Sequence, residues 1–168
     1  MKKEEFTTEE LKAIYKLAKE YEENAPQSEE EQYNDYYGEY EEQISKKIAA
    51  SILKKIAKNL PVVDTEEIDK EFLRRKYHTF NNYVNEKVYA TLKKALEQLK
   101  TIEIEYFNMD SAEFKKRKLD VYYTSSKYTI GHCHLRNEIR KFRTSRIGSA
   151  KLTTSVYRIP KSFDKNDY

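Results

Sequence analysis

The hydrophobic pattern of this 168-residue chain changes its period at Thr101, and no other feature constrains the fold more. Before Thr101, apolar residues recur every three or four positions, as they do along one face of a helix. After it, Ile102 and Ile104 alternate with glutamates, which is the period of a half-buried strand. We therefore predict an α+β chain, with a helical region over residues 1–100 and a small β-rich domain over residues 101–168.

Local signals divide the helical region into separate helices. Thr7 stands three residues before Glu10, as in a capping box, and the first helix should then run to about Glu23. Apolar residues at every fourth position over residues 44–60 predict a second helix, which Pro61 ends because proline disfavours α geometry in the residue before it.

Capping residues also predict where two more helices begin. Asp64 and Thr65 can cap a third helix, and Asn81 or Asn82 can begin a fourth. Between the first two helices, residues 24–39 are acidic and include a proline and a glycine, so we expect a loop there.

Short alternating runs predict four further strands after the first. They lie at about residues 115–123, 128–135, 139–147 and 155–159. Five short strands in about 60 residues are typical of a small, strongly curved antiparallel sheet or barrel.

The composition argues against several classes of function. The chain has only 3 glycines and contains no P-loop, dinucleotide fingerprint, G-x-S-x-G or H-E-x-x-H motif. No apolar run approaches the roughly 20 residues that span a bilayer. A single cysteine, Cys133, agrees with a reducing compartment. We therefore expect a cytoplasmic binding protein that uses no cofactor and no membrane, and not an enzyme.

The net charge of +3 conceals opposite charges in different parts of the chain. Residues 1–45 carry 5 Lys and Arg against 14 Asp and Glu, whereas residues 111–168 carry 14 against 5. A basic block of this kind indicates an anionic partner such as nucleic acid or a nucleotide. A solvated surface is the alternative interpretation of such a charge run.

The basic residues are densest on one predicted hairpin, over residues 128–147. Four arginines there could bind phosphate oxygens bidentately: Arg136, Arg140, Arg143 and Arg146. Alternation along a strand places Arg140 and Arg143 on opposite faces, so all four converge only if a bulge or turn intervenes near Thr144. The alternative is a hairpin with solvated ion pairs, each of which contributes little.

Two kinds of ring accompany these arginines. Strand alternation places Tyr128 and His134 on one face, where the tyrosine could stack on a base; a core position is the alternative for Tyr128. His132 and His134 together suggest a metal site, but no pair of carboxylates follows them at ligand spacing. We therefore predict no metal site.

This stretch resembles the WYL domain of bacterial transcription regulators. The family's Cys-His-x-Arg turn corresponds to residues 133–136, and its Arg-x-Phe-Arg-x-x-Arg-Ile pattern corresponds to residues 140–147. The Trp-Tyr-Leu triplet that names the family falls on residues 128–130. Residues 102–106 look like its first strand and residues 159–164 like the segment that closes the domain.

The resemblance covers residues 101–168 and implies an SH3-like or Sm-like β-barrel that senses a ligand. For several members, that ligand is single-stranded nucleic acid or a nucleotide, bound by arginine and aromatic side chains. Two positions depart from the family: Val121 replaces the usual proline, and Tyr128 the tryptophan. Typical members begin with a winged helix-turn-helix, which the acidic residues 1–45 do not match, so we expect a truncated regulator or a stand-alone sensor.

The first hypothesis is therefore a ligand-sensing protein of the transcription-regulator type. Its binding site for single-stranded nucleic acid or a nucleotide would comprise Tyr128, His134, Arg136, Arg140, Arg143 and Arg146. The resemblance leaves room for a DNA-binding partner chain and for a homodimer. The alternative hypothesis is a helical interaction or assembly subunit whose barrel is structural and whose basic surface meets an acidic protein.

Overall fold

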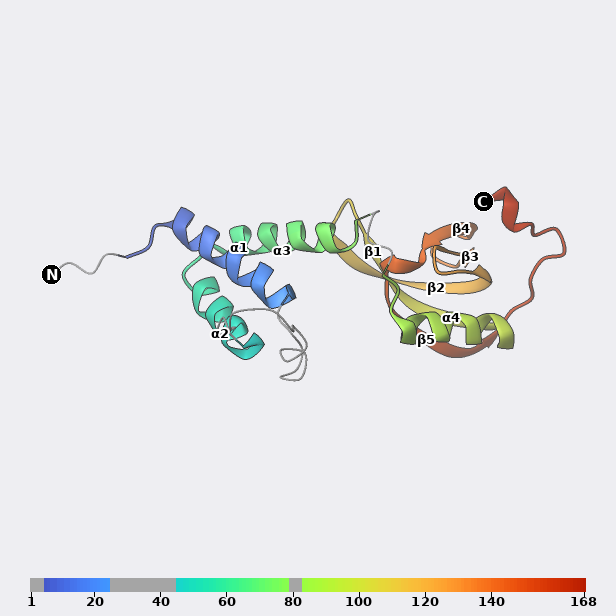
Figure 1. Cartoon of the computed structure of the whole chain (residues 1–168). Helices are drawn as coiled ribbons and strands as arrows, with labels where there is room; N and C mark the ends of the chain where they lie inside the picture. The colour runs from blue at the N-terminus through green and yellow to red at the C-terminus, as the bar shows by residue number, and fades with distance from the viewer. Residues whose placement is uncertain (1–4, 25–44, 79–82) are drawn as a thin grey trace. The chain divides into compact units, whose positions relative to one another are not determined.

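The computed structural model describes residues 5–24, 45–78 and 83–168, and confirms that helices precede an antiparallel sheet (Figure 1). The chain divides into two compact units, Met1–Asp69 and Lys70–Tyr168. The helices are α1 (Thr8–Asn24), α2 (Lys46–Ala57), α3 (Val62–Lys76) and α4 (Glu86–Gln98). The strands are β1 (Lys100–Asn108), β2 (Glu113–Thr124), β3 (Tyr128–Cys133), β4 (Glu138–Arg143) and β5 (Ile147–Val156).

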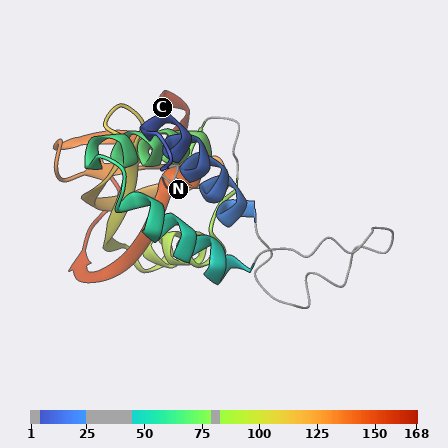
Figure 2. The same cartoon turned by 90° about the vertical axis from the view of Figure 1, so that its left-hand side faces the viewer.

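In the first unit, α1 packs against α2 (Figures 1 and 2). The predicted capping box is present, because the Thr7 backbone N–H donates to Glu10 Oε2 (2.7 Å) and the Glu10 N–H donates to Thr7 Oγ1 (3.3 Å). The Glu10 carboxylate accepts hydrogen bonds from the Thr7 backbone N–H and from the Thr7 hydroxyl (2.8 Å), and both lower the pKa of Glu10. The Tyr15 hydroxyl donates to Asp69 Oδ1 (3.1 Å), which joins α1 to α3.

Two of the predicted helix starts are wrong. Helix α3 begins at Val62, so Asp64 lies in its first turn and does not cap it. Helix α4 is capped by Asn85, whose Oδ1 accepts hydrogen bonds from the backbone N–H groups of Lys87 (3.0 Å) and Val88 (3.3 Å).

Some predictions fall on parts of the chain that lie outside the described residues. Asn81 and Asn82, the predicted caps of the fourth helix, are among them, as is the acidic segment from residue 25 onward. Within the described residues, no helix has both the length and the apolar character needed to cross a membrane.

The five strands form one antiparallel sheet in the order β4-β3-β2-β1-β5. The sheet is not closed, so the prediction of a barrel overstated its geometry. The predicted strand over residues 139–147 is interrupted by a 3-10 turn at Thr144–Arg146, which leads directly from β4 into β5. Strand β5 therefore begins at Ile147, well before the strand predicted at residues 155–159.

The core of the second unit lies between α4 and the inner face of the sheet. Val88, Leu92 and Ala95 repeat at helical spacing and belong to one buried cluster that includes residues of every strand. The strand residues of this cluster are Ile102, Ile104, Leu119, Val121, Cys133, Phe142 and Ile147. Leu92 is fully buried, which stabilises the fold by roughly 1.5–3 kcal/mol. Helix α4, which corresponds to the fourth predicted helix, therefore packs on the sheet as part of the second unit.

The switch from helix to strand occurs at Leu99, which adopts a left-handed conformation (φ 50°, ψ 43°) and ends α4. Its backbone N–H caps the helix by donating to the carbonyls of Ala95 and Leu96. Strand β1 begins at the next residue, Lys100, which explains why the hydrophobic period changes so abruptly at this point.

Candidate functional site

The outer face of β2, β3 and β4, opposite the core, carries the candidate site. Tyr123 pairs with Ile130, Ile130 pairs with Lys141, and Tyr128 pairs with Arg143. Residues that pair across neighbouring strands project from the same face, so these five side chains share one surface.

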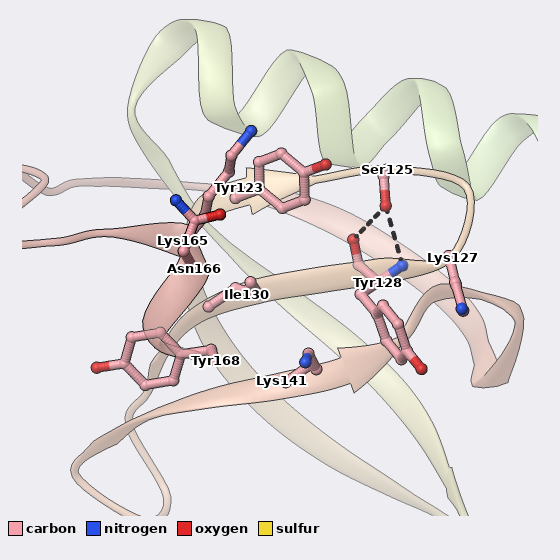
Figure 3. A pocket seen from close by; sticks show the side chains of 9 residues that line it. All are labelled: Tyr123, Ser125, Lys127, Tyr128, Ile130, Lys141, Lys165, Asn166 and Tyr168. Carbon is pink, nitrogen blue, oxygen red and sulfur yellow. Dashed lines mark hydrogen bonds between the residues drawn. The ribbon is translucent and has the colours of Figure 1, made fainter.

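A pocket of about 380 Å³ is open on this surface (Figure 3). It combines three tyrosines with three lysines, and no Asp or Glu is among the described residues that line it. The lining residues are Tyr123, Ser125, Lys127, Tyr128, Ile130, Lys141, Lys165, Asn166 and Tyr168. We call it the tyrosine–lysine pocket.

Each lysine of the pocket lies close to an aromatic ring. The ammonium groups of Lys127 and Lys141 are 5.4 and 4.8 Å from the centre of the Tyr128 ring. Lys165 lies 5.3 Å from the centre of the Tyr123 ring. Cation–π attraction therefore keeps the ammonium groups beside the faces of two tyrosine rings. An anionic ligand with a planar group would contact both an ammonium group and a ring face there.

Hydrogen bonds at the turn between β2 and β3 hold Tyr128 in place. Ser125 Oγ accepts from the Tyr128 N–H and donates to the Tyr128 carbonyl, both at 3.1 Å (Figure 3). The Thr144 hydroxyl donates to the Ser125 carbonyl (2.8 Å) and lies 3.1 Å from the Thr129 hydroxyl. The 3-10 turn and the pocket are thus linked through buried hydroxyl groups.

A later segment of the chain supplies Lys165, Asn166 and Tyr168, and aromatic contacts hold that segment against β2. The Tyr157 hydroxyl donates to the Val121 carbonyl. Tyr122 contacts Tyr157 and Phe163, with ring centres 5.9 and 5.2 Å apart. Burial raises the pKa of both tyrosines. Neither phenol therefore ionises near neutral pH, and the Tyr157 hydrogen bond persists there.

The predicted site residues are only partly brought together. Tyr128 lines the pocket, and Arg143 shares its face. Arg140 precedes Arg143 by three positions on the same strand, so its side chain leaves the opposite face, where it pairs with Glu138 (3.0 Å). Arg140 and Arg143 both precede the turn at Thr144, so this turn does not bring their side chains to the same face.

The other three predicted residues lie elsewhere. Arg146 is in the 3-10 turn, where its Nε donates to the Tyr77 carbonyl (3.2 Å). Arg136 is exposed in the connection between β3 and β4. His134 follows β3, and its Nε2 lies 2.9 Å from Asp120 Oδ1. No single strand face therefore presents all four arginines, and their role in binding stays a prediction.

The three lysines and two further tyrosines of the pocket were missed by sequence reasoning. For Lys141 a signal existed, because period-2 alternation along β4 places it on the face of Arg143 and Tyr128. For Lys165 and Tyr168 there was none, since tertiary contacts of Tyr157 and Phe163 with β2 hold their segment beside the pocket.

One protein family matches part of this chain. The model of the WYL domain family matches residues 87–152, which run from α4 through the five strands. No curated protein matches the chain. Among solved structures, the chain is similar to proteasome accessory factor B/C (PafBC) of Arthrobacter aurescens, with 18% identity and a TM-score of 0.38. That match covers 90% of this chain and 21% of PafBC, so the chain spans about a fifth of that protein's length. Residues 87–152 of this chain therefore form a WYL domain.

Proposed function

We propose that the tyrosine–lysine pocket is the ligand-sensing site of this WYL domain and binds single-stranded nucleic acid or a nucleotide. The observation that carries the proposal is the presence of three lysines and three tyrosines around one pocket, with no Asp or Glu among the described residues that line it. The DNA-binding partner chain and the homodimer that the sequence suggests are part of the same proposal. Binding, not catalysis, is the proposed activity.

The chemistry of the pocket suits a phosphorylated ligand with a planar base. Ammonium groups attract phosphate oxygens as point charges, whereas tyrosine faces stack on bases of any sequence. The pocket volume, about 380 Å³, lies in the range of small-molecule sites, which is roughly 300–1,000 Å³. It therefore suits one nucleotide, either alone or as a unit of a single strand.

A binding titration tests the proposal. Fluorescence anisotropy of a labelled random single-stranded oligonucleotide should show saturable binding that weakens as salt rises. Lys141→Ala should weaken binding and reduce the slope of log K against log salt by about 0.7 if Lys141 contacts one phosphate. Tyr128→Leu should cost roughly 1–3 kcal/mol of binding free energy, whereas Tyr128→Phe, which keeps the ring, should cost less.

Two variants serve as matched controls. Lys151 is an exposed lysine on β5 that does not line the pocket, so Lys151→Ala should leave the affinity almost unchanged. Arg140→Ala, on the face opposite Tyr128, should also have little effect, whereas Arg143→Ala should weaken binding because Arg143 shares the face of Tyr128.

The result that would overturn the proposal is equal affinity of the wild type, Lys141→Ala and Tyr128→Leu for the oligonucleotide and for competing nucleotides. Binding of an acidic protein, without binding of either nucleic acid or nucleotide, would instead support an assembly subunit.

A further inference from the structure

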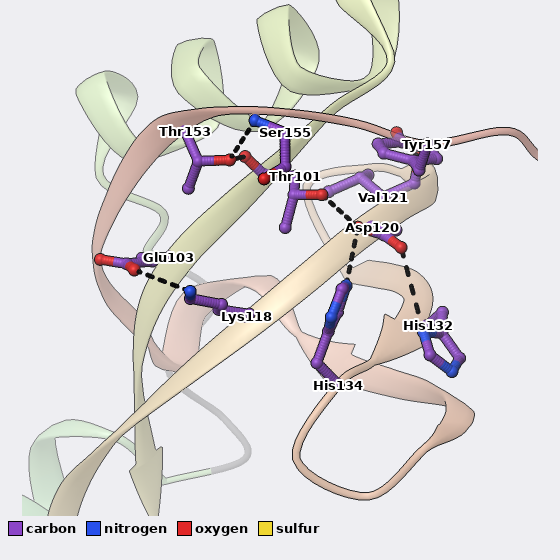
Figure 4. Close-up of polar contacts among 10 residues, drawn as sticks. All are labelled: Thr101, Glu103, Lys118, Asp120, Val121, His132, His134, Thr153, Ser155 and Tyr157. Carbon is purple, nitrogen blue, oxygen red and sulfur yellow. Dashed lines mark hydrogen bonds and ion pairs between the residues drawn. The ribbon is translucent and has the colours of Figure 1, made fainter.

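A second polar cluster lies on the outer face of β2 and β3. It consists of Asp120, His132 and His134 (Figure 4). Asp120 and His132 are paired across the two strands, and His134 follows immediately after β3. One potential ligand atom from each of the three side chains lies within 4.8 Å of the other two. Two imidazoles and a carboxylate thus point toward one small volume.

The geometry of the cluster is close to that of a metal site. His134 Nε2 lies 2.9 Å from Asp120 Oδ1, and His132 Nδ1 lies 3.9 Å from Asp120 Oδ2. Ligands about 2.1 Å from a tetrahedral Zn²⁺ ion lie about 3.4 Å from one another. The two observed separations lie on either side of this value, so small rotations of the imidazoles would suffice for coordination.

The Asp120 carboxylate is nearly buried, because its side chain is only 10% exposed. The Thr101 hydroxyl donates to Asp120 Oδ1 (2.6 Å) and fixes the orientation of the carboxylate. Within the described residues, the two imidazoles are the only basic groups in ion-pair range of Asp120. A buried carboxylate is costly unless a cation or several hydrogen bonds compensate its charge.

We propose that Asp120, His132 and His134 bind a divalent transition metal ion, for which Zn²⁺ is the best candidate. Neutral imidazole nitrogens together with a carboxylate oxygen are ligands that Zn²⁺ favours, whereas Mg²⁺ and Ca²⁺ favour oxygen ligands alone. Cys133 lies between the two histidines in sequence but is fully buried in the core cluster, so it supplies no thiolate.

The proposed metal site is accessible from solvent, and its three protein ligands do not complete the coordination of the ion. The side chains of His132 and His134 are 28% and 43% exposed, so an ion can enter without unfolding of the sheet. Three protein ligands leave at least one coordination position for water or an anion, as in zinc sites that are not purely structural. Thr101 is a positioning residue here, because it holds the carboxylate and does not touch the ion.

Isothermal titration of Zn²⁺ into the untagged full chain, after removal of metals with a chelator, tests the proposal. One ion per chain should bind, and His132→Ala and His134→Ala should each lower the affinity at least about tenfold. The chain has one further histidine, His78, and His78→Ala should bind Zn²⁺ like the wild type. Lys141→Ala should also bind it normally, so failure of this site and failure of the proposed pocket are distinguishable.

The cobalt spectrum of the unmodified chain gives an answer even if a variant does not fold. Co²⁺ bound by two imidazoles and a carboxylate in a four-coordinate site should show visible d–d bands without a thiolate charge-transfer band. The proposal is overturned if Zn²⁺ gives no saturable heat, if both histidine variants fold and keep the wild-type affinity, or if the Co²⁺ spectrum shows thiolate ligation.

Discussion

At the scale of single residues, Tyr15 shows how burial couples an ordinary side chain to pH. Its hydroxyl donates to Asp69 across α1 and α3, and burial, with a smaller contribution from the Asp69 carboxylate, raises its pKa to about 12. The ordinary value is 10.0. Ionisation would both charge a buried ring and remove the donor of this hydrogen bond.

The stability contributed by Tyr15 should therefore be lost in alkali. Because the pKa of the folded state lies above that of the unfolded state, the contribution is complete below pH 10 and declines as the pH rises toward about 12. Thermal unfolding followed by circular dichroism between pH 8 and 12 should show a smaller loss of stability for Tyr15→Phe than for the wild type. Tyr83→Phe, which alters an exposed ring, should follow the wild type; identical curves for all three proteins would contradict the prediction.

Single residues also show what the sequence could not reveal about the candidate sites. Tyr128 was predicted because strand alternation places it on the face of His134 and because it stands at the tryptophan position of the family's triplet. Asp120 was not, because its place beside His132 depends on the register between β2 and β3, which no local pattern specifies. The prediction that the histidines bind no metal rested on the lack of a carboxylate pair at ligand spacing after them, whereas Asp120 lies beside His132 on the neighbouring strand.

At the scale of elements, local patterns predicted what local interactions determine. The capping box of α1 is a relation between residues three apart, and the alternation in β1 is a relation between next neighbours, so both could be read from the sequence. The start of α4 could not, since three asparagines within five positions can all cap a helix. A turn near Thr144 was considered only as the condition for the arginines to converge, and the strand was predicted to continue to Ile147, because threonine is common in strands.

The cap at Asn85 leads to a prediction for α4. Its Oδ1 accepts two backbone hydrogen bonds, so Asn85→Ala should lower the free energy of unfolding by about 1 kcal/mol. Urea titration of the full chain measures this change. Asn59→Ala is the matched control, because Asn59 is exposed after α2 and its side chain donates only one bond, to the Lys55 carbonyl. Equal effects of the two substitutions would show that the cap contributes little.

At the scale of the whole molecule, the division into two compact units predicts that damage to one core leaves the other intact. Leu92 is fully buried in the second unit, and Ile68 is buried in the first. Leu92→Ala should destabilise the second unit by about 2–5 kcal/mol, and Ile68→Ala should have a comparable effect on the first.

Hydrogen–deuterium exchange separates the two effects. Leu92→Ala should accelerate exchange in β1 and β2 but not in α1 and α2, and Ile68→Ala should do the reverse. If either substitution accelerates exchange equally in both units, the chain unfolds as a single cooperative structure and the division has no energetic meaning.

The 3-10 turn at Thr144–Arg146 sets a limit on the shape of the sheet. It joins β4 to β5, which are the outermost strands on opposite sides of the order β4-β3-β2-β1-β5. In a flat sheet these strands would lie four spacings apart, about 19 Å. The four Cα–Cα steps from Arg143 to Ile147 reach at most about 14 Å. A planar arrangement is therefore geometrically unattainable, and the length of this one connection obliges the five strands to roll up around the α4 core.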